Sequence, residues 1–184
     1  MRMGEINGII PAVRKLKGFE DALESDHRWI VILEIRLGQL RSVLDHAKRA
    51  KKKVLLHIDL VQGLKADEYG LEFLINDLKV DGIVSTRASV IELAKKRGVL
   101  AVQRMFLLDS LSLQTDGRIA SKYFPDYIEV LPGKLPEVIQ EIHDHIQIPI
   151  IAGGLINEEI DVKNAYGAGA IAVSTSKKDL WTRK

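Results

Sequence analysis

Short apolar segments rich in β-branched residues recur along this 184-residue chain, and a stretch with helical spacing follows each of them. Segments of about four to seven residues that are mainly apolar, rather than alternately apolar and polar, are typical of strands buried on both faces, as in parallel sheets. Eight segments of this kind predict strands: Gly8–Ala12, Trp29–Ile35, Val54–Asp59, Gly82–Ser85, Val99–Gln103, Tyr127–Leu131, Ile148–Ala152 and Ala170–Ser174.

The stretches between these segments carry the spacing of amphipathic helices. In one of them, apolar residues repeat at intervals of three and four positions: Leu37, Leu40, Leu44 and Ala47. Gly98 follows the basic end of another and suits a left-handed helix cap. Alternation of strand and helix indicates a parallel sheet, and eight units favour a closed (β/α)8 TIM-type barrel over an open doubly wound sheet. The GxGxxG and Walker motifs of nucleotide-binding sheets are absent from the sequence.

The prediction is one compact domain covering residues 1–184. Dividing 184 residues among eight units leaves 23 for each, whereas a typical barrel of this class has about 250 residues in all. Loops should therefore be minimal, with little chain left for the lids that many barrel enzymes use to exclude water. This shortness favours a protein that binds and signals over an enzyme.

Composition excludes several classes of protein. The absence of cysteine excludes a disulfide framework and any cysteine-ligated metal site. No stretch approaches the roughly 18 apolar residues that a membrane span needs, and Met1–Val13 lacks the pattern of a signal peptide, which predicts a cytoplasmic protein with no membrane partner. The net charge of +2 permits a nucleic-acid partner, although an aromatic content of 5% supplies few rings for base stacking.

Charged and polar residues gather where the predicted strands end, which is where a (β/α)8 barrel builds its site. They include Arg14, Glu34, Arg36, His57, Asp59, Ser85, Arg87, Gln103, Arg104 and Glu129. We expect four of them to contact a polar ligand: His57, Asp59, Arg104 and Glu129. A carboxylate at this place can accept hydrogen bonds from ligand hydroxyls or act as a general base. Each acid could also simply pair with Arg87 or Arg104 at the rim.

The last two predicted strands carry the sharpest signal. Gly153 and Gly154 follow the seventh strand, and the hydroxyls of Ser174, Thr175 and Ser176 close the eighth. Glycines let backbone N–H groups approach an anion, and a helix beginning near Ser176 would direct its positive end at the same point. Each feature alone is better explained by a turn or a cap. At these two positions together they predict a phosphate site, because barrels commonly bind phosphate there.

Two absences narrow the chemistry. None of the eight segments contains lysine, so Schiff-base catalysis has no nucleophile, and one strand histidine cannot form a two-histidine metal site. We therefore predict no catalytic residue, no metal and no cofactor. The alternative is an isomerase or lyase for a small phosphorylated polyol or sugar. In that enzyme Glu129 or Asp59 would act as base, and His57 or Arg104 would polarise a carbonyl.

Basic clusters precede the third and fifth predicted strands and should lie on the face opposite the ligand site. They comprise Lys51, Lys52 and Lys53, and Lys95, Lys96 and Arg97. Basic runs of this kind are usually solvated helix ends. If the protein binds RNA, these six residues are the predicted contact surface.

Five ordered segments resemble the GlpP family of glycerol-3-phosphate-responsive antiterminators, and the resemblance extends from about Ile9 to Trp181. They are Leu55–Gly63, Ser85–Arg87, Gln103–Ser110, Asp126–Gly133 and Ala170–Ser176. The resemblance implies a barrel that binds glycerol 3-phosphate as its effector and, in response, binds the leader mRNA of glycerol-utilisation operons. By position it implies that Gly153, Gly154, Thr175 and Ser176 hold the phosphate, with Asp59, Arg104 and Glu129 facing the rest of the ligand. The sequence leaves the oligomeric state open, a homo-oligomer included.

Overall fold

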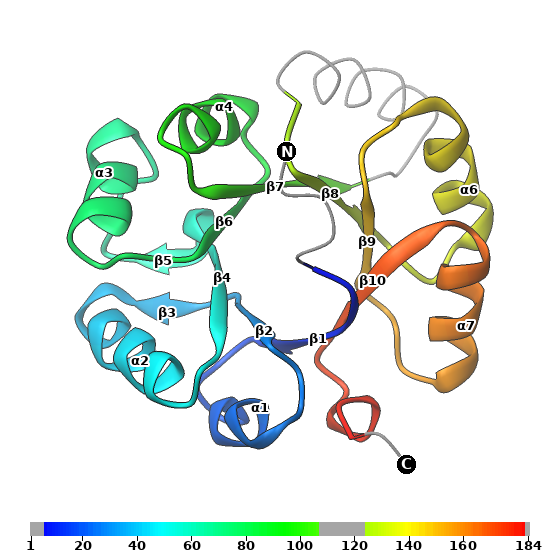
Figure 1. The fold of residues 1–184 in the computed structure, drawn as a ribbon, viewed down its shortest axis with the longest axis horizontal. Coiled ribbons are helices and arrows are strands. Elements are labelled where there is room, and N and C mark those ends of the chain that lie inside the picture. Colours follow the sequence, from blue (N-terminus) through cyan, green and yellow to red (C-terminus); the bar gives the residue numbers. More distant parts are fainter. Residues whose placement is uncertain (1–5, 107–123, 183–184) are drawn as a thin grey trace.

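Eight parallel strands close into a barrel in the computed structural model, which describes residues 6–106 and 124–182. The order around the barrel is β1-β10-β9-β8-β7-β6-β4-β2, and the first and last strands pair to close it (Figure 1). The strands are β1 Gly8–Val13, β2 Trp29–Ile32, β4 Lys53–His57, β6 Gly82–Ser85, β7 Leu100–Phe106, β8 Tyr127–Leu131, β9 Ile150–Gly153 and β10 Ala170–Thr175. The predicted TIM-type (β/α)8 barrel is confirmed.

Helices form a ring outside the sheet (Figure 1). They are α1 Phe19–Glu24, α2 Leu37–Arg49, α3 Glu68–Asn76, α4 Ala88–Lys96, α6 Pro136–His145 and α7 Glu159–Gly167. The spacing predicted for α2 is confirmed, because Leu40, Leu44 and Ala47 are buried. Gly98, with φ of 74°, supplies the predicted left-handed residue after α4. The helical stretch predicted after β7, together with Leu107–Ser110 of the family-like segments, lies outside the described residues.

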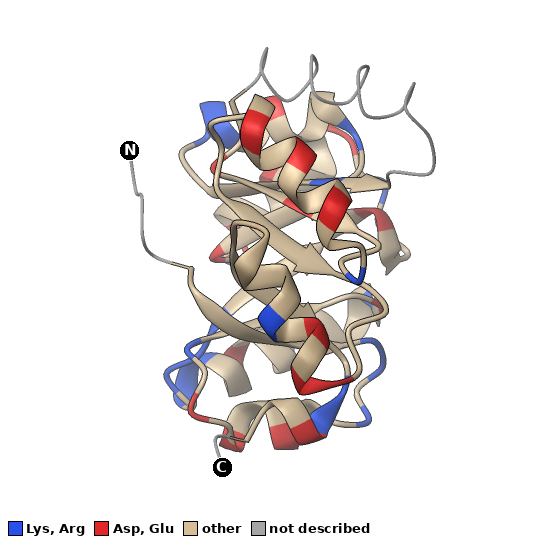
Figure 2. Ribbon diagram, turned by 90° about the vertical axis from the view of Figure 1, so that its right-hand side faces the viewer, with Lys and Arg blue, Asp and Glu red and all other residues tan. Residues whose placement is uncertain are grey.

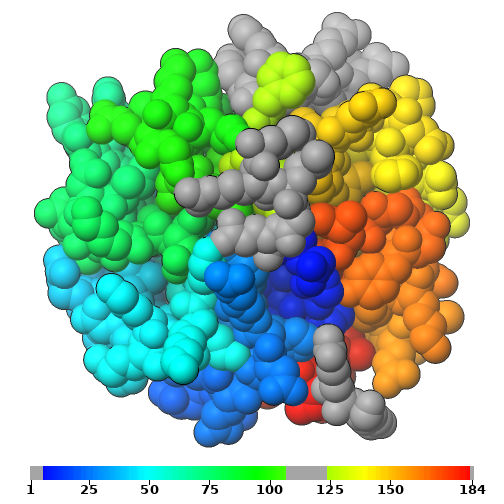
Figure 3. Space-filling model, in the orientation of Figure 1, coloured from blue at the N-terminus to red at the C-terminus, as the bar shows by residue number. Residues whose placement is uncertain are grey.

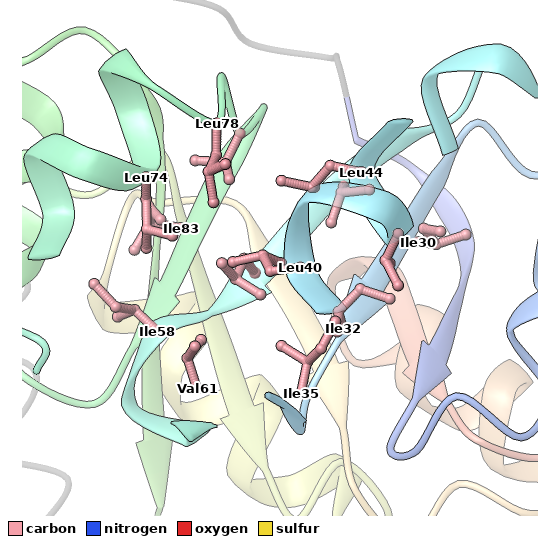
Figure 4. Packing of buried hydrophobic residues seen from close by; sticks show 14 of the residues in the cluster. Ile30, Ile32, Ile35, Leu40, Leu44, Ile58, Val61, Leu74, Leu78 and Ile83 are labelled. Carbon is pink, nitrogen blue, oxygen red and sulfur yellow. The ribbon is translucent and has the colours of Figure 1, made fainter. Parts of the chain in front are cut away.

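Aliphatic side chains hold the helical ring to the barrel. Leu40 and Leu44 of α2 lie beside Ile30 and Ile32 of β2 in one buried cluster (Figure 4). Burying each side chain of this size stabilises the fold by roughly 1.5–3 kcal/mol. The space-filling view follows the chain around this ring from blue to red (Figure 3). The ring is therefore held by burial of apolar surface all along the sheet.

Strand periodicity divides the inside of the barrel into an apolar part and a polar part. Side chains at alternate positions of each strand point into the barrel. In the amino-terminal half of the strands these inward side chains form an apolar cluster that includes Leu55, Val102 and Tyr127. The backbone N–H of Ile6 donates to the hydroxyl of Tyr127 at 3.1 Å, so the one polar atom of that ring is satisfied. Two residues further along β4, β7, β8 and β10 the inward positions become polar: His57, Arg104, Glu129 and Ser174. The carboxyl ends of the strands therefore present functional groups to a shared space.

Two predicted strands end earlier than expected. The segment predicted as Trp29–Ile35 is divided, because β2 stops at Ile32 and a separate strand β3 (Ile35–Arg36) pairs with β5 (Val61–Gln62) in a small second sheet. The segment predicted as Val54–Asp59 forms β4 only to His57, and Ile58–Leu60 is the 3₁₀ helix η1. Asp59 leaves the strand because its carboxylate binds the Ser85–Arg87 segment of the neighbouring unit.

The end of the chain also differs from the prediction. No α-helix follows β10 in the described residues. The 3₁₀ helix η2 (Lys178–Leu180) takes its place and leads to Trp181. The indole of Trp181 is buried and donates from Nε1 to the carbonyl oxygen of Thr175 at 2.8 Å. This contact turns the chain back onto the barrel within a few residues, which leaves no length for a helix there.

Candidate functional site

A pocket of about 570 Å³ opens at the carboxyl ends of the strands. Eight of the nine residues predicted to contact a ligand line it: His57, Asp59, Arg104, Glu129, Gly154, Ser174, Thr175 and Ser176. The ninth, Gly153, lies directly behind two of them. The structure therefore brings together residues from strands that are distant in sequence, as the barrel prediction required.

Glu129 is the centre of a buried polar network at the floor of this pocket. Its Oε2 accepts a hydrogen bond from Nε of Arg104 at 2.7 Å, and its Oε1 accepts one from Oγ of Ser174 at 2.6 Å. The side chains of this ion pair are only 8% and 4% exposed. Removing one member of a pair buried to this extent typically costs about 3–5 kcal/mol, because the other charge stays buried without compensation. The floor is therefore fixed in position before any ligand enters.

Gly153 makes room for this network. A Cβ atom at this position would lie 2.7 Å from Oε1 of Glu129 and 2.7 Å from Oγ of Ser174. No side chain fits there unless the carboxylate or the hydroxyl moves. The glycine predicted to approach an anion thus has a more direct role, which is to let two polar side chains meet behind it.

Asp59 forms a second network at the side of the pocket. Its carboxylate accepts hydrogen bonds from Oγ of Ser85 at 2.8 Å, from the backbone N–H of Thr86 at 2.9 Å, and from Nε and Nη2 of Arg87 at 2.8 and 2.7 Å. Burial acts to raise the pKa of Asp59, but these hydrogen bonds outweigh it, so the pKa is lowered. A carboxylate that accepts four hydrogen bonds and has a lowered pKa is a weak base. Arg87 is the partner expected at the rim.

His57, at the floor of the pocket, has a buried ring nitrogen that makes no hydrogen bond with the described residues. Its side chain is 4% exposed, and its Nδ1 is the buried side-chain nitrogen or oxygen without a hydrogen-bond partner among the described residues. The nearest acid is Asp59, whose Oδ2 lies 3.8 Å from Nδ1, beyond hydrogen-bonding distance. Burial and the adjacent Arg104 guanidinium lower the pKa of His57 to about 4, although Asp59 and Glu129 act to raise it. The imidazole is therefore neutral at physiological pH, and its buried Nδ1 has no hydrogen-bond partner among the described residues.

The predicted phosphate loops enclose the opposite side of the pocket. Gly154 has φ of 75°, a left-handed conformation that suits glycine, and it turns the chain sharply after β9. Thr175 is committed to the protein, since its Oγ1 donates to the carbonyl of Ile156 at 2.7 Å and accepts from the N–H of Lys177 at 3.0 Å. Ser176 is exposed at the pocket wall. The helix predicted to begin near Ser176 or Lys177 is present only as the three-residue 3₁₀ helix η2, which starts at Lys178.

The six basic residues predicted to contact RNA lie at the amino ends of β4 and β7, on the face opposite the pocket. Several are engaged by the protein: Lys95 pairs with Asp126 at 2.5 Å, and Arg97 with Glu68 and Glu72 at 3.4 and 3.1 Å. Lys52 donates to the carbonyl oxygens of Ser25 and His27, and Lys96 pairs with Glu92 at 2.8 Å. Figure 2 shows Lys and Arg interleaved with Asp and Glu around the barrel. The surface stays a prediction, with much of its charge locally balanced.

One strand of the barrel contains a lysine, although none of the eight predicted segments does. β4 begins at Lys53, so a strand does contain a lysine. It lies at the amino end, with its ammonium nitrogen 5.1 Å from the centre of the Trp29 ring, away from the pocket. Within residues 6–106 and 124–182, no cluster of three or more metal-ligating side chains occurs, and no helix has the length and apolarity to span a membrane.

Sequence reasoning missed part of the pocket lining. Thr86 and Asn157 add polar groups, and an apolar part of the wall comes from Leu33, Leu60, Phe106, Leu131, Leu155 and Ile156. Each of these residues lies within four positions of the end of a strand, which is the signal that could have identified them. The pocket is therefore amphipathic, with a polar floor and a partly apolar wall.

Comparison with known proteins agrees with this description. The chain matches the family described as "Glycerol-3-phosphate responsive antiterminator" over residues 9–181. A glycerol uptake operon antiterminator regulatory protein from Listeria monocytogenes has a solved structure that is 42% identical, with a TM-score of 0.93 over 98% of this chain and 97% of that one. A glycerol uptake operon antiterminator-related protein from Thermotoga maritima is 28% identical, with a TM-score of 0.85 over 95% of this chain and 98% of that one.

Two further matches are less informative about function. The uncharacterized protein YgcP of Escherichia coli is 34% identical over 176 residues, which is 96% of this chain and 92% of YgcP. The structure of QR15, an aldolase, is 14% identical, with a TM-score of 0.75 over 97% of this chain and 94% of that one. At that level of identity the likeness to QR15 shows the barrel fold alone.

Proposed function

The chain belongs to the family of glycerol-3-phosphate responsive antiterminators, and from that premise we propose that it binds glycerol 3-phosphate in the pocket at the carboxyl ends of its strands. In response it binds the leader mRNA of glycerol-utilisation operons and prevents premature termination of transcription. Glycerol 3-phosphate is the effector in this proposal, and no cofactor or metal takes part.

The observation that supports the ligand assignment best is the unsatisfied Nδ1 of His57 at the pocket floor. A buried nitrogen without a partner costs free energy, so a hydroxyl group that donates to it is favoured. We assign that hydroxyl to the glycerol part of the ligand, beside Arg104 and Glu129. The phosphate then lies toward Gly154 and Ser176, where the chain turns around the pocket mouth. Because Ser174 and Thr175 already bind protein atoms, they hold the site in shape rather than contact the phosphate.

The state of the two carboxylates favours a regulator over the alternative enzyme. An isomerase or lyase would need Glu129 or Asp59 as a general base, with a free lone pair directed at the substrate. Glu129 is bound by Arg104 and Ser174, and Asp59 by three residues of the next unit. Both carboxylates are organised as acceptors that shape the site.

Calorimetric titration of the protein with glycerol 3-phosphate, glycerol and inorganic phosphate tests the effector. We expect one site per chain for glycerol 3-phosphate and far weaker binding of the two fragments, since each fragment makes only half of the contacts. Equal affinity for inorganic phosphate and glycerol 3-phosphate would contradict the role given to His57. Turnover of triose or pentose phosphates that is lost in Glu129→Gln would instead support the enzyme.

The regulatory part of the proposal is tested with RNA. Fluorescently labelled leader transcript from the source organism's glycerol uptake operon is titrated with protein in the presence and absence of glycerol 3-phosphate. The effector should raise the affinity for RNA, because a ligand that favours the RNA-binding state shifts the population toward it. An affinity for RNA that does not depend on glycerol 3-phosphate would refute the regulator.

A further inference from the structure

A second concavity lies on the same face of the barrel, beside the ligand pocket. Its volume is about 440 Å³, and it is formed by the loops after β1, β2 and β4. The small sheet of β3 and β5 lines it, and the register of this sheet places Arg36 next to Gln62. Lys15, Gln39 and the carboxylate of Glu34 complete its polar lining. We call this concavity the β3–β5 groove.

The cations of the β3–β5 groove are free to bind another molecule. Lys15 and Arg36 are exposed, and the side chain of neither takes part in an ion pair or a hydrogen bond within the part of the chain that the structure describes. On the opposite face Lys95 and Arg97 are paired with acidic residues, whereas the exposed side chain of Lys51 has no partner among the described residues. The groove therefore carries two cations whose side chains have no partner among the described residues, beside one carboxylate, Glu34, which lies 4.0 Å from Arg14. The place is hollow enough to receive a ligand.

The groove also shares a wall with the ligand pocket. Segment 14–16 supplies Arg14 to the pocket and Lys15 to the groove. Segment 33–36 supplies Leu33 to the pocket and Arg36 to the groove. The two segments touch where Nε of Arg14 lies 4.0 Å from Oε1 of Glu34. A molecule in the groove therefore lies against the same two segments that a pocket ligand contacts.

We infer that the β3–β5 groove is the site that binds single-stranded RNA, an inference that rests on the proposed function. Lys15 and Arg36 bind phosphates of the RNA backbone, and the amides of Gln39 and Gln62 offer both donors and acceptors to the edge of an unpaired base. A groove of this size takes one or two nucleotides of a loop and excludes an RNA duplex. This site differs from the two basic clusters predicted from the sequence. Because it lies beside the pocket, binding of the effector changes the RNA site directly, with no change transmitted across the barrel.

Two double variants that each remove two positive charges test this inference. Lys15→Gln with Arg36→Gln changes the groove, whereas Lys48→Gln with Lys51→Gln changes exposed residues on the opposite face. Binding of the labelled leader transcript is measured by fluorescence anisotropy at saturating glycerol 3-phosphate over a range of salt concentrations. The groove variant should lose on the order of tenfold in affinity, with the salt slope reduced by about 1.4, which corresponds to two lost phosphate contacts on a single strand. The matched variant should keep an affinity close to that of the wild type.

Binding of glycerol 3-phosphate, measured by calorimetry, shows that each variant is folded and should be unchanged in both. Loss of RNA affinity in the opposite-face variant alone, or in neither variant, overturns the groove assignment and leaves the proposed function standing. Failure of the wild-type protein to bind the leader overturns the proposed function and the groove assignment with it. Cross-linking with 4-thiouridine gives an independent readout: adducts should form within residues 14–17 and 33–39, and adducts confined to residues 48–53 would contradict the inference.

Discussion

Acid should destabilise this protein through His57, because the folded chain holds that imidazole neutral. The pKa of His57 is lowered from 6.5 to about 4 by burial and by the nearby Arg104, against the opposing effects of Asp59 and Glu129. In the unfolded chain the imidazole regains its ordinary pKa and binds a proton first as the pH falls. The contribution to stability is therefore complete above about pH 6.5 and is lost as the pH falls toward 4.

The size of this effect follows from the difference between the two pKa values. Each unit corresponds to about 1.4 kcal/mol, so the full loss below pH 4 is about 3 kcal/mol. Between about pH 7.5 and about pH 5, most of the unfolded chains gain the proton and the folded chains do not, and the expected loss is about 2 kcal/mol. The lowered pKa of Asp59 does not contribute in this interval, since its effect appears below its ordinary value of 3.8.

Urea denaturation of ligand-free protein at about pH 7.5 and about pH 5 measures this loss as the change in the free energy of unfolding. A His57→Gln variant keeps a polar side chain but cannot titrate, so its loss between the two values should be smaller than that of the wild type by about 2 kcal/mol. His46→Gln removes an exposed histidine on α2 and is the matched control. Equal pH dependence in the wild type and His57→Gln would refute the argument that burial keeps His57 neutral.

Three further substitutions test the site and its support. Arg104→Met should lower the free energy of unfolding by about 3–5 kcal/mol, measured by urea denaturation, because Glu129 is left buried without its cation; a loss below 1 kcal/mol would show that the pair is hydrated. Gly153→Ala should lower both thermal stability and affinity for glycerol 3-phosphate, because its Cβ would meet two side chains at 2.7 Å, whereas Gly167→Ala, with nothing within 4 Å, should keep both. Asp161→Ala should cost roughly 0.5–2 kcal/mol in thermal denaturation, since that carboxylate caps the start of α7, and an unchanged melting temperature would contradict this role.

Strand periodicity predicts part of the lining of the pocket. Because inward positions recur every second residue, the polar end of each strand could be identified from the sequence, and His57, Arg104, Glu129 and Ser174 do meet at the floor. Asp59 closes the predicted strand Val54–Asp59, but it lies in η1. Its departure depends on the Ser85–Arg87 segment of the next unit, which is 26 or more positions away. A local sequence pattern does not identify a partner that lies so far away along the chain.

The β3–β5 groove, in contrast, could not be predicted from the sequence. The segment Trp29–Ile35 is apolar except for Glu34 and predicts one strand, whereas the chain pairs only its first part with the barrel. Ile35 instead pairs with Val61, and this small sheet turns Arg36 and Gln62 outward. Both pairings bury the same apolar residues, so hydrophobicity alone does not distinguish them.

By itself the sequence determined the alternation of strand and helix, the barrel, and the end of the barrel at which polar groups gather. These depend on spacing along the chain, and spacing can be read one segment at a time. Only the tertiary structure decided which polar atoms are satisfied. Glu129 is bound by Arg104 and Ser174, which are 25 and 45 positions away, while Nδ1 of His57 among them has no partner. Closure of the barrel brings these groups within hydrogen-bonding distance, because it fixes the register between neighbouring strands, and register is a property of pairs of strands rather than of any one segment.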